Sequence, residues 1–241
     1  MYGRIWTTSL FLLIAAPAAA VDCGDVTHLG QDYTVCRVAA GAEDLALYHT
    51  DDSGAVIGGF AALDALRPDR RLVFAMNAGM YHEDRSPVGL FVKDGIETAP
   101  LITSDGPGNF GLLPNGVFCL TGTSAAIFES RAYAARPPGC RDASQSGPML
   151  VIDGALHPRF IPGGASTHIR NGVGVAADGR TTYFAISNAP VNFHDFATLF
   201  RDTLGTPDAL FFDGSVSRLY APQIGRDDFG FQLGPMVAVF E

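Results

Sequence analysis

Lysine is almost absent from this sequence: only Lys93 is a lysine among 16 basic residues, and the other fifteen are arginines. The chain also has too few basic residues to balance its 25 acidic ones, so its formal charge is −9. Phosphate backbones are bound by basic patches, which excludes nucleic acid as the expected partner. A bias in genomic base composition accounts for the preference for arginine, yet each guanidinium remains a planar donor suited to phosphate or carboxylate.

Long apolar runs are missing as well. No stretch reaches the ~18 apolar residues of a membrane-spanning helix. The first twenty residues combine Arg4, an apolar stretch from Leu10 to Ala15 and the ending Ala18-Ala19-Ala20, which is typical of a cleaved signal peptide. A membrane anchor is the alternative, but this apolar core is too short for one. We therefore expect a signal peptide over residues 1–20 and an exported mature protein, periplasmic or secreted, without a membrane anchor.

The spacings that mark metal and redox sites are absent. There is no C-x-x-C pair, and no H-E-x-x-H or H-x-E-x-H motif. Four cysteines in an exported chain predict two disulfides, and proximity favours Cys23–Cys36 and Cys119–Cys140 among the three pairings. We expect no cofactor, although scattered carboxylates and histidines leave a bound Ca²⁺ or Zn²⁺ open.

Short apolar runs rich in valine, phenylalanine and tyrosine alternate with turn residues from residue 21 to the end. No linker or repeat divides them, so we expect one domain over 21–241. Asp94-Gly95, Asp153-Gly154 and Asp178-Gly179 predict type I′ hairpin turns. Helical spacing of apolar residues predicts helices over 193–204, capped by Asn192 and ended by Gly205, and over 61–66. The fold class expected is α+β, with helices packed on a mixed, mostly antiparallel sheet.

Polar residues interrupt several of the apolar runs abruptly. "VFAMNAGM" places Asn77 and Gly79 directly after a strand, and "SQSGPMLV" places Ser146 and Gly147 directly before one. His168 and Arg170 lie two positions apart before a glycine-spaced strand, and so share a face if extended. "ALFFDGSVSR" ends a strand at Asp213, where a carboxylate at the edge of an apolar environment needs a charge partner. Arg170 and Arg218 are the expected partners.

The order of these segments resembles the phosphodiester glycosidase family, the bacterial relatives of the Golgi uncovering enzyme, N-acetylglucosamine-1-phosphodiester alpha-N-acetylglucosaminidase. The matching positions are Asn77-Ala78-Gly79-Met80, Ser146-Gly147-Pro148, Arg170 with Gly172 and Gly174, and Asp213-Gly214 with Ser217. The sequence departs from the uncovering enzyme at Ser215, where that enzyme has a second glycine. The resemblance therefore implies the reaction of the family and not the particular substrate of that enzyme.

The resemblance implies a hydrolase that cleaves the glycosidic bond of a sugar-1-phosphodiester or phosphoglycan, giving a free sugar and a phosphomonoester. We assign Asp213 to activate water or stabilise the oxocarbenium-like centre, Arg170 to hold the phosphate and His168 as the candidate proton donor. Substrate contacts are expected from the remaining residues of the matched segments: Asn77, Gly79, Ser146, Gly147, Ser217 and Arg218. The alternative is an exported glycan- or phosphoglycan-binding module without turnover. A metal-dependent phosphodiesterase is disfavoured by the absent metal motifs.

Overall fold

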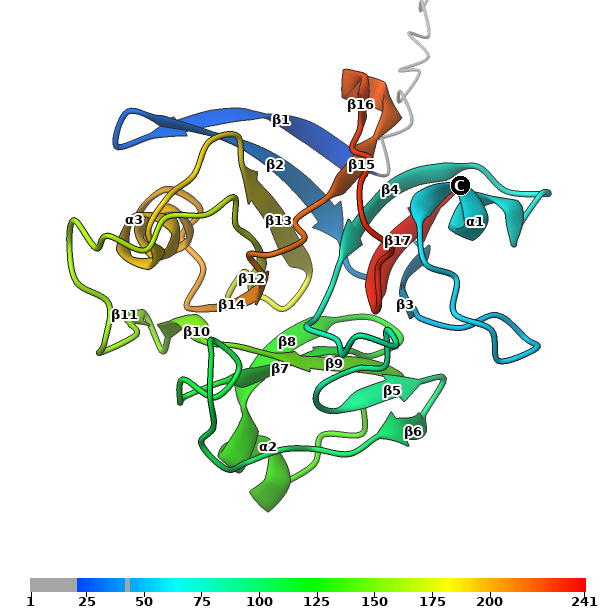
Figure 1. Cartoon of the computed structure of the whole chain (residues 1–241), viewed down its shortest axis with the longest axis horizontal. Coiled ribbons are helices and arrows are strands. Elements are labelled where there is room, and N and C mark those ends of the chain that lie inside the picture. The colour runs from blue at the N-terminus through cyan, green and yellow to red at the C-terminus, as the bar shows by residue number, and fades with distance from the viewer. Residues whose placement is uncertain (1–20, 42–43) are drawn as a thin grey trace, which may run out of the picture.

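The structure is a computed structural model that describes residues 21–41 and 44–241; the predicted signal peptide lies outside the described residues. The chain forms three sheets arranged around a common centre (Figure 1). The first sheet contains, in spatial order, β1 (Val21–His28), β2 (Gln31–Ala39), β13 (Thr181–Ser187), β12 (Asn171–Val175), β14 (Asp208–Asp213), β10 (Met149–Ile152) and β11 (Ala155–Leu156). The second contains β16 (Arg226–Asp227), β15 (Leu219–Ala221), β4 (Leu72–Asn77), β17 (Met236–Phe240) and β3 (Asp44–Tyr48). The third contains β6 (Ile96–Ala99), β5 (Phe91–Lys93), β9 (Asp142–Ser146), β7 (Gly116–Leu120) and β8 (Ala125–Glu129).

The hydrophobic core lies where one face of each sheet turns toward the other two. Phe74 of β4 packs on Phe184 of β13 at 4.9 Å between ring centroids, and Phe118 of β7 contacts both Phe184 and Phe212 of β14. These strands are covered on both sides, so their residues are apolar on both faces and show no alternation. The central core therefore joins segments from the whole length of the described chain.

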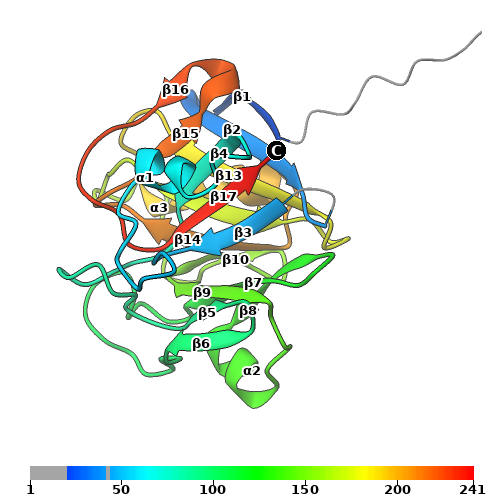
Figure 2. The ribbon, with the colours of Figure 1, turned by 90° about the vertical axis from the view of Figure 1, so that its right-hand side faces the viewer.

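A short helix covers the outer face of each sheet (Figures 1 and 2). The helices are α1 (Phe60–Ala65) on the second sheet, α2 (Ser130–Ala135) on the third and α3 (Phe193–Thr198) on the first. A π-helical turn, η1 (Leu199–Thr203), continues α3, and a 3₁₀ turn, η2 (Pro222–Ile224), follows β15. The two helices predicted from apolar spacing are confirmed, including the Asn192 cap, whose Oδ1 accepts a 2.9 Å bond from Asp195 N.

The fold is richer in β-structure than the α+β class predicted. Every strand pair in the described residues is antiparallel, so the mixed sheet is wrong, and the three α-helices have only six residues each. The hairpin turns Asp94-Gly95 and Asp153-Gly154 have positive φ at both residues, as type I′ requires. The prediction for Asp178-Gly179 is wrong, because Asp178 does not have a positive φ. Its carboxylate accepts hydrogen bonds from the backbone N–H groups of Arg180 and Thr181, and the turn is of a different type.

Both predicted disulfides are confirmed. Cys23–Cys36 links β1 to β2 at directly opposed positions, and Cys119–Cys140 links β7 to the segment before β9. Two disulfides among the described cysteines fit a protein of an oxidising compartment. In the part of the chain that the structure describes, no helix is long and apolar enough to cross a membrane.

Candidate active site

The polar residues that interrupt the apolar strands meet where the first and second sheets come together. Asn77 ends β4, Asn171 begins β12 opposite Asp213, and Asp213 ends β14. Asn171 Nδ2 donates to Asn77 O at 2.8 Å and to Asn77 Oδ1 at 3.0 Å, and Asn77 Nδ2 donates to Asn171 Oδ1 at 3.3 Å. Both amides are fully buried. The amide pair therefore fixes the end of β4 against the start of β12, directly after Arg170.

Asp213 is held on the same amide pair. Its backbone N–H donates to Asn171 Oδ1 at 3.2 Å, and its carbonyl accepts from Ser217 Oγ at 2.9 Å. The Ser217 hydroxyl also lies 3.0 Å from Ile169 O. The turn after β14 is thus folded back onto β12, and the Asp213 carboxylate is positioned by backbone contacts on both sides.

Asp213 is almost buried, at 8% exposure. Burial raises its pKa above the usual value, against the backbone N–H groups of residues 214–216, which lower it. The predicted ion pair with Arg170 or Arg218 is wrong: the ion pairs of the described residues include none with Asp213. Both guanidinium groups instead donate to backbone carbonyls, Arg218 through all three of its nitrogens and Arg170 through Nε and Nη2.

Arg170 is a fully buried cation that forms no ion pair within the described part of the chain. Its Nε donates to Val191 O and its Nη2 to Ser166 O, each at 2.9 Å, while Nη1 is buried without a partner. A Cβ built on Gly214 would lie 3.6 Å from this Nη1, so the free donor is next to the residue that follows Asp213. Burial lowers the pKa of Arg170 to about 10, which leaves the guanidinium charged at neutral pH.

A column of rings supports the Arg170 guanidinium. Its Cζ lies 3.5 Å from the ring centroid of Phe193, the first residue of α3. Phe193 stacks in turn on Phe160 at 4.9 Å, and Phe160 on His157 at 4.7 Å. A cation over an aromatic face is stabilised by the ring quadrupole, more so where water is excluded. The column therefore fixes the plane of the guanidinium, in which Nη1 is the nitrogen without a hydrogen-bond partner.

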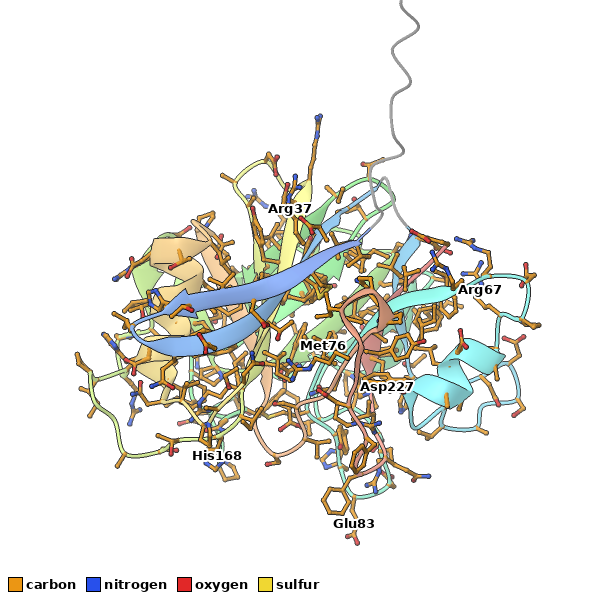
Figure 3. The ribbon with its side chains drawn as sticks, turned by 90° about the horizontal axis from the view of Figure 1, so that it is seen from above. Arg37, Arg67, Met76, Glu83, His168 and Asp227 are labelled. Atoms are coloured by element: carbon orange, nitrogen blue, oxygen red, sulfur yellow. A yellow bond between two sulfur atoms is a disulfide. The ribbon has the colours of Figure 1, made fainter. Side chains whose placement is uncertain are left out.

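His168 and Arg218 border this centre in different ways. His168 is exposed and at the surface (Figure 3), and its backbone pairs with Val191. Its Cβ would lie 3.6 Å from a Cβ on Gly214. The Arg218 backbone N–H donates to Asn77 Oδ1 at 2.9 Å, but its guanidinium points to the carbonyls of Asp228 and Phe231. Arg218 thus holds the segment before β17, and its predicted substrate contact stays a prediction.

Comparisons with known proteins show the family of this chain. The sequence profile described as phosphodiester glycosidase matches residues 70–230. The uncharacterized protein YigE of Escherichia coli (strain K12) is 35% identical over 215 residues, which cover 88% of this chain and 83% of YigE. The chain belongs to the phosphodiester glycosidase family. Its matched region contains all the polar residues of the centre described above.

Two solved structures share the fold of this phosphodiester glycosidase family member at low sequence identity. One is the zebrafish N-acetylglucosamine-1-phosphodiester alpha-N-acetylglucosaminidase catalytic domain, auto-inhibited by its pro-peptide, with a TM-score of 0.64 and 10% identity over 94% of this chain and 85% of that one. The other is a Burkholderia pseudomallei K96243 protein described as exported, with a TM-score of 0.52 and 11% identity over 87% of this chain and 74% of that one.

Three of the family-motif residues have packing roles in this structure. Ser146 is fully buried and its Oγ donates to Phe212 O at 2.8 Å, which ties β9 to β14. A Cβ on Gly79 would lie 2.7 Å from Ser144 Oγ, and one on Gly147 would lie 2.5 Å from Asn115 Cβ. Close approach of neighbouring chain segments therefore explains both glycines. Their predicted contacts with substrate remain predictions.

Asn171 was not among the residues expected from the sequence, although it connects Asn77, Asp213 and Ser217. The only signal for it is its place in "HIRNGVGV", directly after Arg170 and before a buried strand. Ser215, which departs from the uncovering enzyme, is exposed, and its backbone N–H donates to Asp213 Oδ1 at 2.7 Å. That contact uses the backbone alone and does not depend on the side chain at this position.

Proposed function

We propose that this protein is an exported phosphodiester glycosidase that hydrolyses the bond between the anomeric carbon of a sugar and a phosphodiester oxygen. The observation that carries the proposal is Arg170, a buried guanidinium whose Nη1 has no partner and that pairs with no carboxylate among the residues the structure describes. A buried cation without a partner costs folding free energy, so a bound anion would relieve it. In this family the anion would be the phosphate group of the substrate.

The leaving group explains why the centre contains one buried carboxylate. Ordinary glycosidases need a carboxylic acid to protonate the departing alkoxide as well as a second carboxylate. A phosphomonoester, with a second pKa of about 6, can leave as an anion held by arginine. Arg170 Nη1 would bind a phosphate oxygen and stabilise the charge that grows there as the bond breaks.

Asp213 is suited to receive the proton of the attacking water. Burial raises its pKa, which makes the carboxylate a stronger base than an ordinary aspartate. Water oxygen forms the new bond to the anomeric carbon, the old carbon–oxygen bond breaks, and its electron pair stays on the phosphate oxygen. The water proton passes to Asp213, and exposed His168 beside Gly214 is the candidate to protonate the departing phosphate.

Hydrolysis of a chromogenic sugar-1-phosphodiester in ¹⁸O-labelled water tests this proposal. We expect the label in the sugar and none in the phosphomonoester, because the carbon–oxygen bond breaks. Label in the phosphate would show cleavage at phosphorus and make the protein a phosphodiesterase. Binding of the substrate without turnover would favour the glycan-binding alternative.

Phe193 provides a test of the ring column. Phe193→Leu removes the face under the guanidinium, and we expect KM for the phosphodiester to rise about tenfold with a smaller change in kcat. Phe193→Tyr keeps the ring and should restore the wild-type KM. The matched control is Phe200→Leu, which removes a fully buried ring from η1 on the same face of the sheet. Equal changes in KM for Phe193→Leu and Phe200→Leu would mean that only general packing is involved.

A further inference from the structure

The register between β12 and β14, which lie side by side (Figure 1), changes at the residues that carry the candidate base. Asn171 is opposite Asp213, but the next residue of β12, Gly172, is opposite Phe211. Phe212 is therefore an extra residue in β14, and the strand forms a β-bulge there. Because a bulge bends its strand and redirects the neighbouring side chains, it sets the direction in which the Asp213 carboxylate leaves β14.

The Asn171 side chain is a hydrogen-bond partner of Asp213 beside this bulge. Its Oδ1 accepts from the Asp213 backbone N–H at 3.2 Å and from Ser217 Oγ at 3.3 Å, so it holds both ends of the turn after β14. Its Nδ2 donates to the backbone carbonyl of Asn77 at 2.8 Å and to Asn77 Oδ1 at 3.0 Å. Asn171 is fully buried. One side chain therefore fixes the strand end of Asp213 to the end of β4 in the second sheet.

This position requires the chemistry of an amide. Asparagine both donates and accepts hydrogen bonds on one short side chain. An aspartate here would place an acceptor against the Asn77 carbonyl and a second carboxylate beside Asp213. An alanine would leave the Asp213 N–H and the Asn77 carbonyl without these partners, and buried backbone groups without partners cost free energy. The turn that carries Asp213 would then shift to find other partners.

We infer that Asn171 is a positioning residue of the proposed reaction: its amide holds the Asp213 carboxylate in the direction from which it takes the proton of the attacking water. This inference rests on the proposed function and adds to it a residue that touches none of the reacting atoms. Asn171 directly follows Arg170 in the sequence. The same short segment therefore places both the base and the guanidinium that would bind phosphate.

Asn171→Ala tests the inference through the split between kcat and KM. We expect kcat for a sugar-1-phosphodiester to fall about 10²-fold, because a small misplacement of a catalytic group costs that much, and KM to change less than about twofold. If the alanine variant does not fold, Asn171→Thr, which is closer in size, replaces it with the same expectation. The matched control is Asn115→Ala, which removes another fully buried amide, one that donates to Phe110 O at 2.9 Å directly before β7. It should lower Tm similarly and keep the wild-type kcat.

The Asp213→Asn background shows whether Asn171 acts through the base. If it does, Asn171→Ala should cause no further loss of kcat in the Asp213→Asn variant, since the carboxylate that it positions is already gone. An equal loss of kcat in both backgrounds would overturn the inference. Wild-type kcat in Asn171→Ala, or an equal loss of kcat in Asn115→Ala, would overturn it as well.

A ¹³C NMR titration of the Asp213 carboxyl needs no substrate. Burial and the backbone N–H groups that follow Asp213 set its pKa, so this pKa depends on where the carboxylate lies. We expect the raised pKa to fall toward the ordinary aspartate value in Asn171→Ala, because the loosened turn admits water, and to stay unchanged in Asn115→Ala. An unchanged pKa in Asn171→Ala contradicts the inference alone. Failure of the wild type to hydrolyse the phosphodiester at the anomeric carbon contradicts the proposed function alone.

Discussion

Asp213→Asn should fold normally and lose catalysis by about 10²–10⁴-fold in kcat. The amide keeps the size of the side chain and an Oδ1 that can accept the 2.7 Å bond from Ser215 N, but it cannot take a proton from water. Turnover of a sugar-1-phosphodiester and a thermal melt of the same preparation check the two halves of this expectation. Wild-type turnover by a well-folded variant would show that Asp213 is a turn residue and not the catalytic base.

The melt also has an expected sign. Burial raises the pKa of Asp213 in the folded protein above its unfolded value of about 4. The protonated carboxyl therefore stabilises the fold fully at a pH below the unfolded pKa, and this stabilisation is lost as the pH rises through the folded pKa. Asp213→Asn resembles the protonated form, so its Tm should exceed that of the wild type at pH 7, and the difference should shrink in acid. Activity should follow the opposite course and fall as pH drops through the raised pKa.

Asp208 offers a matched control on the same strand. It begins β14, its carboxylate accepts a 3.1 Å bond from Asp153 N, and burial also raises its pKa. Asp208→Asn should therefore change stability in the same direction and leave turnover unchanged. Equal loss of activity in both variants would point to a general effect on β14. The search for the base would then move to Asp195, Glu83 and Asp84, of which Glu83 lies at the outer end of its loop (Figure 3).

Local patterns predicted much of this structure because the determinants are local. Asn192 and Gly205 mark the helical segment between them through capping and a positive φ, and each cysteine pairs with its neighbour in the sequence. The strands could be predicted from the apolar runs, but the way they are divided among three sheets could not. A strand buried on both faces has no alternation, so its sequence does not show which neighbour lies on each side.

The amide pair at the centre of the site lay beyond such reasoning. Asn77 and Asn171 are 94 positions apart, and nothing near Asn171 in the sequence indicates a distant amide partner. The partners of Arg170 were equally hidden, because they are backbone carbonyls of Ser166 and Val191 on two separate segments. The sequence suggested a guanidinium free to bind phosphate. In the structure only its Nη1 has no partner among the described residues.

Arg170→Met should lower kcat/KM by about 10²–10³-fold, as loss of one donor to a developing anion does in other enzymes. The variant removes the buried charge and keeps an apolar chain over Phe193. Wild-type protein should melt at higher temperature as inorganic phosphate or a sugar phosphate is added, since the ligand binds the folded state. Arg170→Met should lose this phosphate-dependent rise. Arg201→Met makes the same charge change at a partly exposed residue paired with Asp202, and should keep the phosphate-dependent rise.

Arg170→Lys separates charge from geometry. The guanidinium holds Val191 O through Nε and Ser166 O through Nη2, and still presents Nη1 beside Gly214. An ammonium concentrates its three donors at one point, so it cannot span both carbonyls and reach the phosphate. We expect Arg170→Lys to retain part of the phosphate-dependent rise in Tm but to raise KM more than it lowers kcat. If Arg170→Met instead keeps the full response to phosphate and the wild-type KM, Arg170 serves only to join the segments of Ser166 and Val191, and the anion must bind elsewhere.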